Sequence, residues 1–259
     1  MATRVPADDE LVPRPPLGRV FEQARRVRLG DVSPGGRLRL DAATRYLQDV
    51  SADDTADAAL PDAESWVVRR TVLEVHSFPR YLEPVSVATW CSGTGSHYAE
   101  RRVQVLGDSG GHVEGSSLWV HVDMATGRPK RLGEGFHGLY GEAAGGRAVK
   151  ARRVHGDASA DAVVVRMPWV LRFTDFDVLQ HVNNAAYWEI VEEVLSSRRD
   201  LRAPLRAELE HRSAMERGAV VEVVTAAGHE GEPLHLWVVA DGSVAATVRI
   251  APLIPPTAD

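Results

Sequence analysis

The sequence predicts an α+β protein built from two similar units in tandem, each an antiparallel sheet wrapped around one helix. Two observations lead to this fold class. A stripe of apolar residues with helical spacing occurs twice, with Tyr187 lying 144 positions after Ala43. Each stripe is followed by strand-like runs with no helix between them, and strands that follow directly upon one another pair antiparallel. The simplest explanation is an internal duplication.

The repeated stripe is the most regular feature of the chain. The later copy has the i, i+3, i+4, i+7, i+8 spacing of one helical face and carries glutamates on the other face. Its apolar residues are Tyr187, Ile190, Val191, Val194 and Leu195. The earlier copy consists of Ala43, Tyr46, Leu47 and Val50, each 144 positions before its counterpart. At the same offset Arg28 corresponds to Arg172, and Asp31 to Asp175.

The strands flank these helices in the same order in both halves. Val27 and Leu29 predict a short strand before the first helix, with a turn at 31–36. The runs expected after it are 66–75, 85–90, 98–106 and 117–122. Those expected after the second helix are 205–211, 220–225, 234–240 and 245–250.

These elements predict four segments. Residues 1–18, rich in proline and acidic residues, predict a flexible arm. The first unit covers 19–125, and the second, which carries the candidate catalytic motif, covers 160–259. The region between them, 126–159, is rich in glycine and lacks periodicity, so we expect a long connection without regular structure. Its basic residues include Arg128, Lys130, Arg131, Lys150, Arg152 and Arg153.

Composition excludes several classes of protein. A formal net charge of −6 argues against a protein that wraps nucleic acid, and we expect no nucleic-acid partner. The single cysteine, Cys91, excludes an internal disulfide and a metal site built from cysteines. No apolar run resembles a signal peptide or reaches membrane-spanning length, so we expect a cytoplasmic protein with no membrane span.

Polar side chains collect just before the second helix. Asp177 and His181 lie in the loop that leads to it, Asn183 is placed to cap its first turn, and Val182 can pack on Tyr187 as a hydrophobic staple. The free amides of a helix start can stabilise a developing oxyanion. The plain alternative is that Asp177 and His181 only satisfy a tight turn. Asn183 and Asn184 are open between capping and substrate contact.

These residues resemble the acyl-ACP thioesterases, a family with a double hotdog fold of two tandem sheet-around-helix units. The family pattern D-L-D-x-N-Q-H-V-N-N-x-x-Y is similar to the residues from Asp175 to Tyr187. GRLRLDAATRYLQDV, from Gly36, and WVVRRTVLEVHSFPRYLEPVSVATW, from Trp66, resemble the first hotdog of the family. The resemblance runs from about Val20 to about Ile250, and it implies hydrolysis of an acyl thioester without cofactor or metal.

Transferred residue by residue, the family's catalytic Asp and His fall on Asp177 and His181. The chain departs from the pattern at three positions. Leu179 stands in place of the family's Asn, Ala214 in place of its catalytic Glu, and Met215 in place of its Cys. Cys91 does not match that Cys position, and we expect it to be an inert strand residue.

The resemblance therefore predicts an acyl-ACP thioesterase that releases free fatty acid, with Asp177 and His181 as catalytic residues. It implies an acidic acyl carrier protein that docks on the basic residues of 126–159, and a homodimer is compatible with the sequence. An acyl-CoA thioesterase is one alternative. A non-hydrolytic acyl-thioester binder with a degenerate site is another. A hotdog hydratase is a third, but the residues between its Asp and His differ from those here.

Overall fold

The computed structural model describes residues 11–59, 66–157, 164–226 and 231–253. The first unit contains β1 (Val20–Arg26), α1 (Leu40–Asp57), β2 (Trp66–Ser77), β3 (Pro84–Thr94), β4 (Tyr98–Gly107) and β5 (His112–His121). Helix α2 (Glu134–Ala144) lies in the connection. The second unit contains β6 (Val164–Trp169), α3 (Asn184–Ser196), β7 (Leu205–His211), β8 (Val221–Ala226), β9 (Leu234–Ala240) and β10 (Ser243–Pro252).

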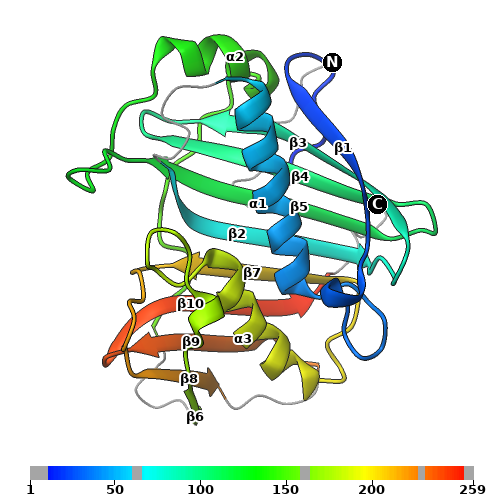
Figure 1. Cartoon of the computed structure of the whole chain (residues 1–259), viewed down its shortest axis with the longest axis vertical. Helices are drawn as coiled ribbons and strands as arrows, with labels where there is room; N and C mark the ends of the chain where they lie inside the picture. Colours follow the sequence, from blue (N-terminus) through cyan, green and yellow to red (C-terminus); the bar gives the residue numbers. More distant parts are fainter. Residues whose placement is uncertain (1–10, 60–65, 158–163, 227–230, 254–259) are drawn as a thin grey trace.

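These ten strands form one sheet in the order β1-β3-β4-β5-β2-β7-β10-β9-β8-β6, and every neighbouring pair is antiparallel. Counted outward from the β2–β7 junction, the order is β2-β5-β4-β3-β1 in the first unit and β7-β10-β9-β8-β6 in the second. Each strand therefore has its counterpart at the same distance from the junction. Helices α1 and α3 lie side by side on one face, each in front of its own half of the sheet (Figure 1). The predicted double hotdog is therefore confirmed, and so is the edge-to-edge joining of its two units.

The offset of 144 residues relates more than the apolar stripes. Strand β1 and helix α1 begin 144 positions before β6 and α3, respectively. A short 3-10 turn at Leu29–Asp31 has its counterpart at Phe173–Asp175, and in both turns the aspartate accepts a hydrogen bond from the backbone of an arginine. Arg28 and Arg172 are those arginines. The conserved offset through strand, turn and helix supports the duplication.

One predicted strand was misplaced. The strand expected around Val27 and Leu29 lies earlier, at Val20–Arg26, and Leu29 begins the 3-10 turn with 72% of its surface exposed. The strand is anchored by pairing with β3, from Val20 with Trp90 to Arg26 with Pro84. Such pairing between distant residues decides the position of a short strand more than its own composition does.

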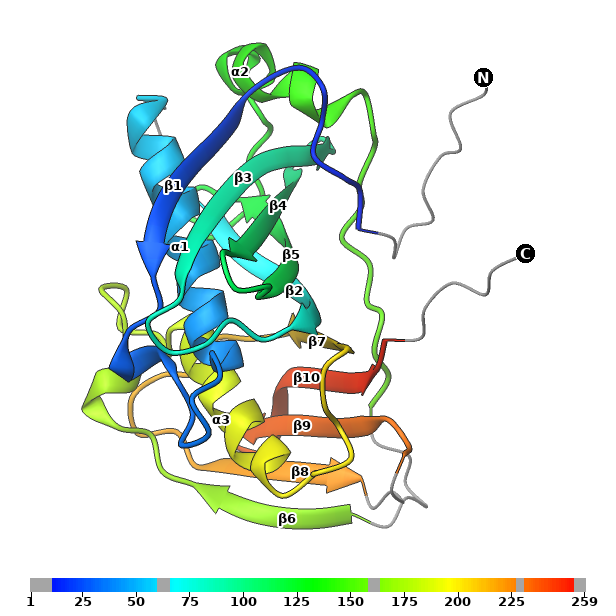
Figure 2. The same ribbon diagram turned by 90° about the vertical axis from the view of Figure 1, so that its right-hand side faces the viewer.

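The connection contains regular structure that was not expected. Helix α2 packs at the end of the first unit, where Tyr140 is fully buried and its hydroxyl donates to the Asp54 carboxylate of α1 at 2.7 Å. After α2 the chain runs down the face of the sheet that the helices do not cover (Figure 2). We propose to keep the division into units at 19–125 and 160–259, with α2 in the connection.

Part of the expected N-terminal arm is held against the first unit. The Val12 carbonyl accepts a hydrogen bond from Arg102 Nε at 3.0 Å, and Arg14 pairs with Glu22 at 2.8 Å. Residues 1–10 of the arm lie outside the described residues. Among the described helices, none combines the length and apolar character that crossing a membrane requires.

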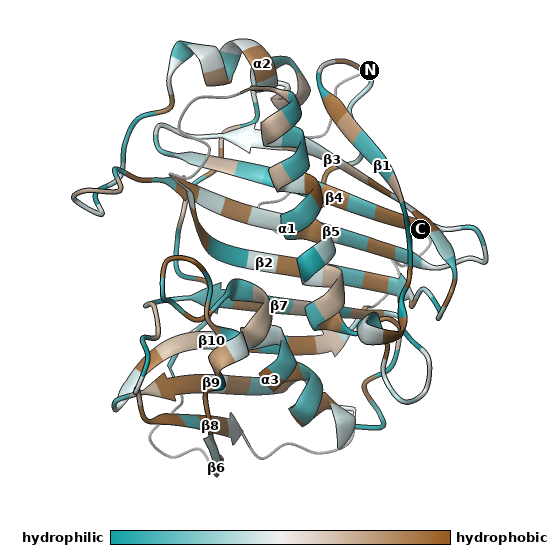
Figure 3. Ribbon diagram, viewed as in Figure 1, coloured by the Kyte–Doolittle hydropathy of each residue, from teal (hydrophilic) through white to brown (hydrophobic). Residues whose placement is uncertain are grey.

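One apolar core lies between the helices and the sheet and extends through both units. Apolar and polar residues alternate along the strands (Figure 3), so each strand turns one set of side chains toward the helices. Across the junction, Leu73 and Val75 of β2 belong to the same core as Leu205, Ala207 and Leu209 of β7. The two units therefore share a core and do not fold around separate ones.

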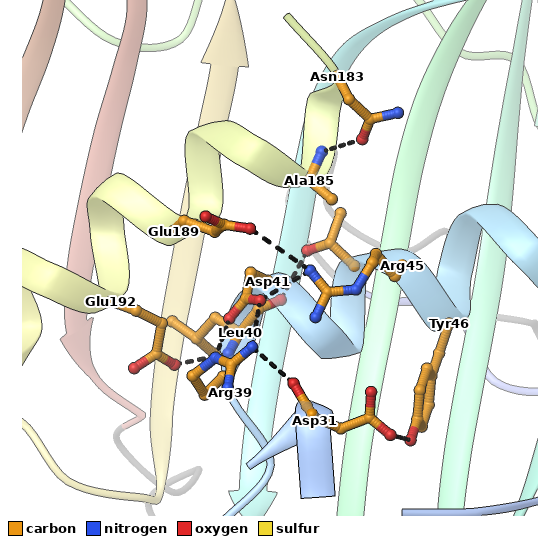
Figure 4. A network of polar contacts seen from close by, with 12 residues as sticks. Asp31, Arg39, Leu40, Asp41, Arg45, Tyr46, Asn183, Ala185, Glu189 and Glu192 are labelled. Atoms are coloured by element: carbon orange, nitrogen blue, oxygen red, sulfur yellow. Dashed lines mark hydrogen bonds and ion pairs between the residues drawn. The ribbon is translucent and has the colours of Figure 1, made fainter. Parts of the chain in front are cut away.

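The two helices are tied together by charged groups at the start of α1 (Figure 4). The Glu192 carboxylate of α3 accepts the Leu40 backbone N–H at 2.6 Å and the Arg37 guanidinium at 2.8 and 2.9 Å. Arg45 lies 3.8 Å from Glu189, the residue 144 positions after it. A carboxylate at a helix N-terminus is favoured by the helix dipole, so Glu192 stabilises α1 from outside.

We predict that Glu192→Ala lowers the free energy of unfolding by about 2–3 kcal/mol, because it leaves the Leu40 amide and the Arg37 guanidinium without their charged acceptor. Glu193→Ala is the matched control, since this exposed neighbour makes no side-chain hydrogen bond or ion pair with the described residues and its loss should cost less than about 0.5 kcal/mol. Urea titrations measure both values. Equal destabilisation would mean that Glu192 does not join the helices.

Candidate active site

The loop before α3 is a tight turn closed by backbone hydrogen bonds. Asp177 N–H donates to the His181 carbonyl at 2.9 Å, and Gln180 N–H donates to the Asp177 carbonyl at 3.0 Å. Gln180 takes the left-handed region with φ 62°, where its counterpart in the first unit is Gly36 with φ 74°. The turn therefore has the same backbone in both units, and the side chains alone distinguish the second unit.

The Asp177 carboxylate takes part in this turn. Its Oδ1 accepts the N–H of Leu179 at 2.9 Å and lies 3.4 Å from the N–H of His181. Within the described residues, Oδ2 receives no hydrogen bond. The turn-forming interpretation thus accounts for one oxygen of Asp177, and the other is available to a water molecule or a substrate.

His181 is held by a second segment, residues 213–216, which follows β7. His181 forms an isolated antiparallel bridge with Glu216, and the next residue, Val182, donates its N–H to the Met215 carbonyl at 3.0 Å. Directly opposite residues in such a pair point to the same face, and successive residues alternate. Accordingly, Val182 and Met215 are buried, while Glu216 is exposed on the His181 face.

The start of α3 shows which asparagine caps the helix. Asn183 is the N-cap, and its side-chain oxygen accepts the Ala185 N–H at 2.8 Å, as predicted. The Ala186 N–H donates to the Asn183 carbonyl at 2.9 Å. Of the first three helical amides, only that of Asn184 lacks a partner among the described residues. We expected several free amides here, and the capping leaves one.

Two buried rings lie behind this loop. Tyr187 and His211 meet edge to face with centroids 4.8 Å apart, and the Tyr187 hydroxyl donates to the Ser213 carbonyl at 3.5 Å. Burial, together with the nearby charge of Arg69, lowers the pKa of His211 to about 3, so this ring is neutral. No local pattern indicated this contact, since His211 occupies an ordinary inward strand position.

An apolar cavity of about 380 Å³ lies between α1 and the sheet of the first unit. Its walls include the second half of α1 and the rings of Trp66, Trp119 and Phe136. Trp66 begins β2 next to the end of β7, where Arg69 Nη1 contacts the Arg212 carbonyl at 3.4 Å. Asp177 and His181 do not line the cavity, but the 213–216 segment leads from the end of β7 to His181.

Cys91 lines the same cavity and is not suited to be a nucleophile. It is 2% exposed, and burial raises the pKa of its thiol to about 11, which keeps it protonated. Its thiol donates to the Gly93 carbonyl at 3.5 Å, and no basic side chain among the described residues hydrogen-bonds to it. The structure thus agrees with the expectation of an inert strand residue.

Family models match both halves of the chain. The N-terminal domain of acyl-ACP thioesterases matches residues 18–140, and the C-terminal domain matches residues 159–251. The chain belongs to the acyl-ACP thioesterase family.

The relatives and neighbours agree with this family. An uncharacterized protein of Mycobacterium tuberculosis is 32% identical over 93% of this chain and 96% of its own length. The chloroplastic palmitoyl-acyl carrier protein thioesterase of Arabidopsis thaliana is 26% identical over 81% of this chain, which spans about half of that relative (55%). The 12:0-ACP thioesterase from Umbellularia californica shares the fold, with a TM-score of 0.71 at 23% identity over 90% of this chain and 96% of its own.

The three departures from the family pattern have different surroundings. Leu179 is half-exposed in the turn, and only its backbone contacts Asp177. Met215 is buried with 1% exposure and packs into the core. Ala214 is exposed, two residues before Glu216. In this acyl-ACP thioesterase family member, a carboxylate therefore follows the position of the usual glutamate on the same segment.

We predict that Asn183→Ala and Asn184→Ala have separable effects. Asn183→Ala should lower the free energy of unfolding by about 1 kcal/mol because it removes the N-cap acceptor. Asn184→Ala should change stability by less than about 0.5 kcal/mol. If the Asn184 side chain contacts the substrate, losing that contact in Asn184→Ala should instead raise KM in a thioester assay. A loss of stability in Asn184→Ala equal to that in Asn183→Ala would contradict the assigned cap.

Proposed function

We propose that the protein hydrolyses acyl thioesters carried on acyl carrier protein and releases the free fatty acid. The observation that carries the proposal is the match of both units to the acyl-ACP thioesterase family, with Asp177 and His181 of the family motif held at the start of α3. The free Oδ2 of Asp177 and the unpaired Asn184 amide support it. A cytoplasmic location is part of the same proposal.

The geometry suggests a role for each group. Asp177 Oδ2 takes a proton from water as the water attacks the thioester carbonyl, and His181 orients that water. The backbone N–H of Asn184 stabilises the negative oxygen of the tetrahedral intermediate. The intermediate then collapses with loss of a thiolate, which is a good leaving group. The acyl chain occupies the apolar cavity beside Trp66. The cavity volume of about 380 Å³ is suited to an apolar ligand.

The carrier is proposed from charge. The basic residues expected to dock the carrier are exposed along the connection. They are Arg128, Lys130, Arg131, Lys150, Arg152 and Arg153. An acidic carrier protein would be attracted to such a surface, and its association would weaken as salt concentration rises. Comparing turnover of one acyl chain on carrier protein and on CoA tests this choice. Tight binding of acyl-ACP without release of thiol would favour the non-hydrolytic alternative.

We predict that Asp177→Asn lowers kcat at least about a hundredfold while the melting temperature hardly changes. Asparagine keeps the side-chain oxygen that accepts the Leu179 N–H, so the turn is preserved and only the charge is lost. Asp177→Ala should lose both activity and stability. Thiol release from acyl-ACP measures activity. Near wild-type turnover in Asp177→Asn would limit Asp177 to its turn-forming role.

We also propose that Glu216 takes over the role of the carboxylate that Ala214 lacks. The two positions are on one segment, and both are exposed while Met215 between them is buried, which is the alternation of an extended chain. A shift of two residues moves the Cα by about 7 Å along the strand without turning the side chain away. Glu216 therefore faces the same side as His181 and can help to position the attacking water.

We predict that Glu216→Gln and Glu216→Ala each lower kcat at least about tenfold. Moving the carboxylate back, in Ala214→Glu with Glu216→Ala, should recover most of the activity lost in Glu216→Ala. The exposed Glu193→Gln is the control for a general effect of charge. If both Glu216 variants keep full activity, the carboxylate has no part in the reaction. Failure of the double variant to recover activity would show that the two positions are not interchangeable.

A further inference from the structure

A second cavity, of about 310 Å³, lies on the sheet face opposite α1 and α3. It is formed by the strands near the junction of the two units and by the connection, which runs along this face (Figure 2). The charged residues of its wall are Arg69, Arg70, Arg152, Arg153, Glu210 and Arg212. Five arginines thus surround one small space with a single carboxylate.

That carboxylate offsets only part of the positive charge. Glu210 accepts the backbone N–H groups of Val154 at 3.1 Å and of His155 at 3.2 Å, so its oxygens also hold the connection in place. Arg212 pairs with Asp157 outside this wall. Arg69, Arg70 and Arg153 make no ion pair with the described residues, and these like charges in a partly enclosed space favour a bound anion.

Arg70 has donors to spare at this wall. It is half-buried, and its guanidinium makes no hydrogen bond or ion pair with the described residues. Polar groups taken partly out of water in folded proteins are usually satisfied, so this guanidinium at the cavity wall points to a ligand oxygen.

This cavity is close to the candidate active site along the chain. Its wall includes Glu210, His211 and Arg212, and four residues later Glu216 bridges to His181. Four extended residues span at most about 14 Å. The pantetheine arm of a thioester carrier is a flexible linear chain of comparable reach, with the sulfur at one end and a phosphate at the other.

We propose that the arginine cavity binds the phosphate of the 4′-phosphopantetheine arm while the thioester lies at Asp177 and His181. This inference rests on the proposed function. A phosphate oxygen pair matches the parallel N–H groups of an arginine, which makes arginine the preferred partner of phosphate. Carrier protein and CoA present the same phosphopantetheine unit, so the cavity recognises what the two carriers share. The acyl chain and the carrier then enter from opposite sides of the sheet.

The test compares two thioesters that differ only in this group, acyl-pantetheine and acyl-4′-phosphopantetheine with the same acyl chain. Wild-type protein should show at least a tenfold lower KM for the phosphorylated substrate. Arg70→Met should remove most of that advantage by raising KM for this substrate alone, with kcat nearly unchanged. Arg199→Met is the matched control, because Arg199 is an exposed arginine that lines a different groove, beside the helices.

Three results would overturn the proposal. One is an equal wild-type KM for the two thioesters, and another is an equal effect of Arg70→Met on both. The third is that Arg70→Met raises KM for only one of the two substrates acyl-CoA and acyl-ACP. The phosphate is common to both carriers, so both KM values should rise. Arg153→Met gives a second variant on the exposed connection should Arg70→Met fold poorly.

Calorimetry separates this proposal from the proposed function. Titration of 4′-phosphopantetheine, which carries no acyl group, should give binding that pantetheine lacks and that Arg70→Met weakens about tenfold. This result would support the cavity even if no thioester is hydrolysed. Hydrolysis of acyl thioesters without any preference for the phosphorylated arm would leave the proposed function intact and remove the phosphate site.

Discussion

The antiparallel pairing of β2 with β7 is the interaction on which the rest of the structure depends. It runs from Arg70 opposite Glu210 to Val75 opposite Leu205, and it leaves neither central strand with an open edge. Because the two strands are antiparallel, the units are related by an approximate twofold rotation, and both helices must lie on one face. The same pairing brings the start of β2, with Trp66 and the apolar cavity, beside the end of β7, after which residues 213–216 pass beside His181.

The duplication places the same backbone turn in two different surroundings. The turn before α1 and the turn before α3 have the same backbone hydrogen bonds, and the same position is left-handed in both, with Gly36 in the first and Gln180 in the second. In the first unit the position of His181 is taken by Arg37, which is bound to Glu192 and ties the helices together. In the second unit the ring of His181 has no hydrogen-bond partner among the described residues. The first copy of the turn therefore joins the two helices through Arg37, and the second copy makes no such ion pair.

Periodic features could be predicted from the sequence because they depend on neighbouring residues. The helical stripe, the Asn183 cap and the strands 205–211 and 234–240 are of this kind, and all are confirmed. The position of β1, the contact between Tyr187 and His211 and the bridge between His181 and Glu216 could not be predicted. Each depends on pairing between residues far apart in sequence, which no local pattern contains. Helix α2 was not predicted because its glycines have low helix propensity. Its buried face, formed by Tyr140, Ala143 and Ala144, is short.

A departure from a family motif has to be judged on the folded surface. Ala214 removes a carboxylate from the family's position, and from the sequence alone this suggests a weakened site. In the structure Ala214 and Glu216 are both exposed, while Met215 between them is buried in the core, so positions 214 and 216 are on the outer side of the segment beside His181. The proposed reaction requires a carboxylate oxygen on that face, within reach of the attacking water. A side chain as long as that of Glu216 can meet this requirement from either position, and therefore the missing motif residue does not by itself imply a lost activity.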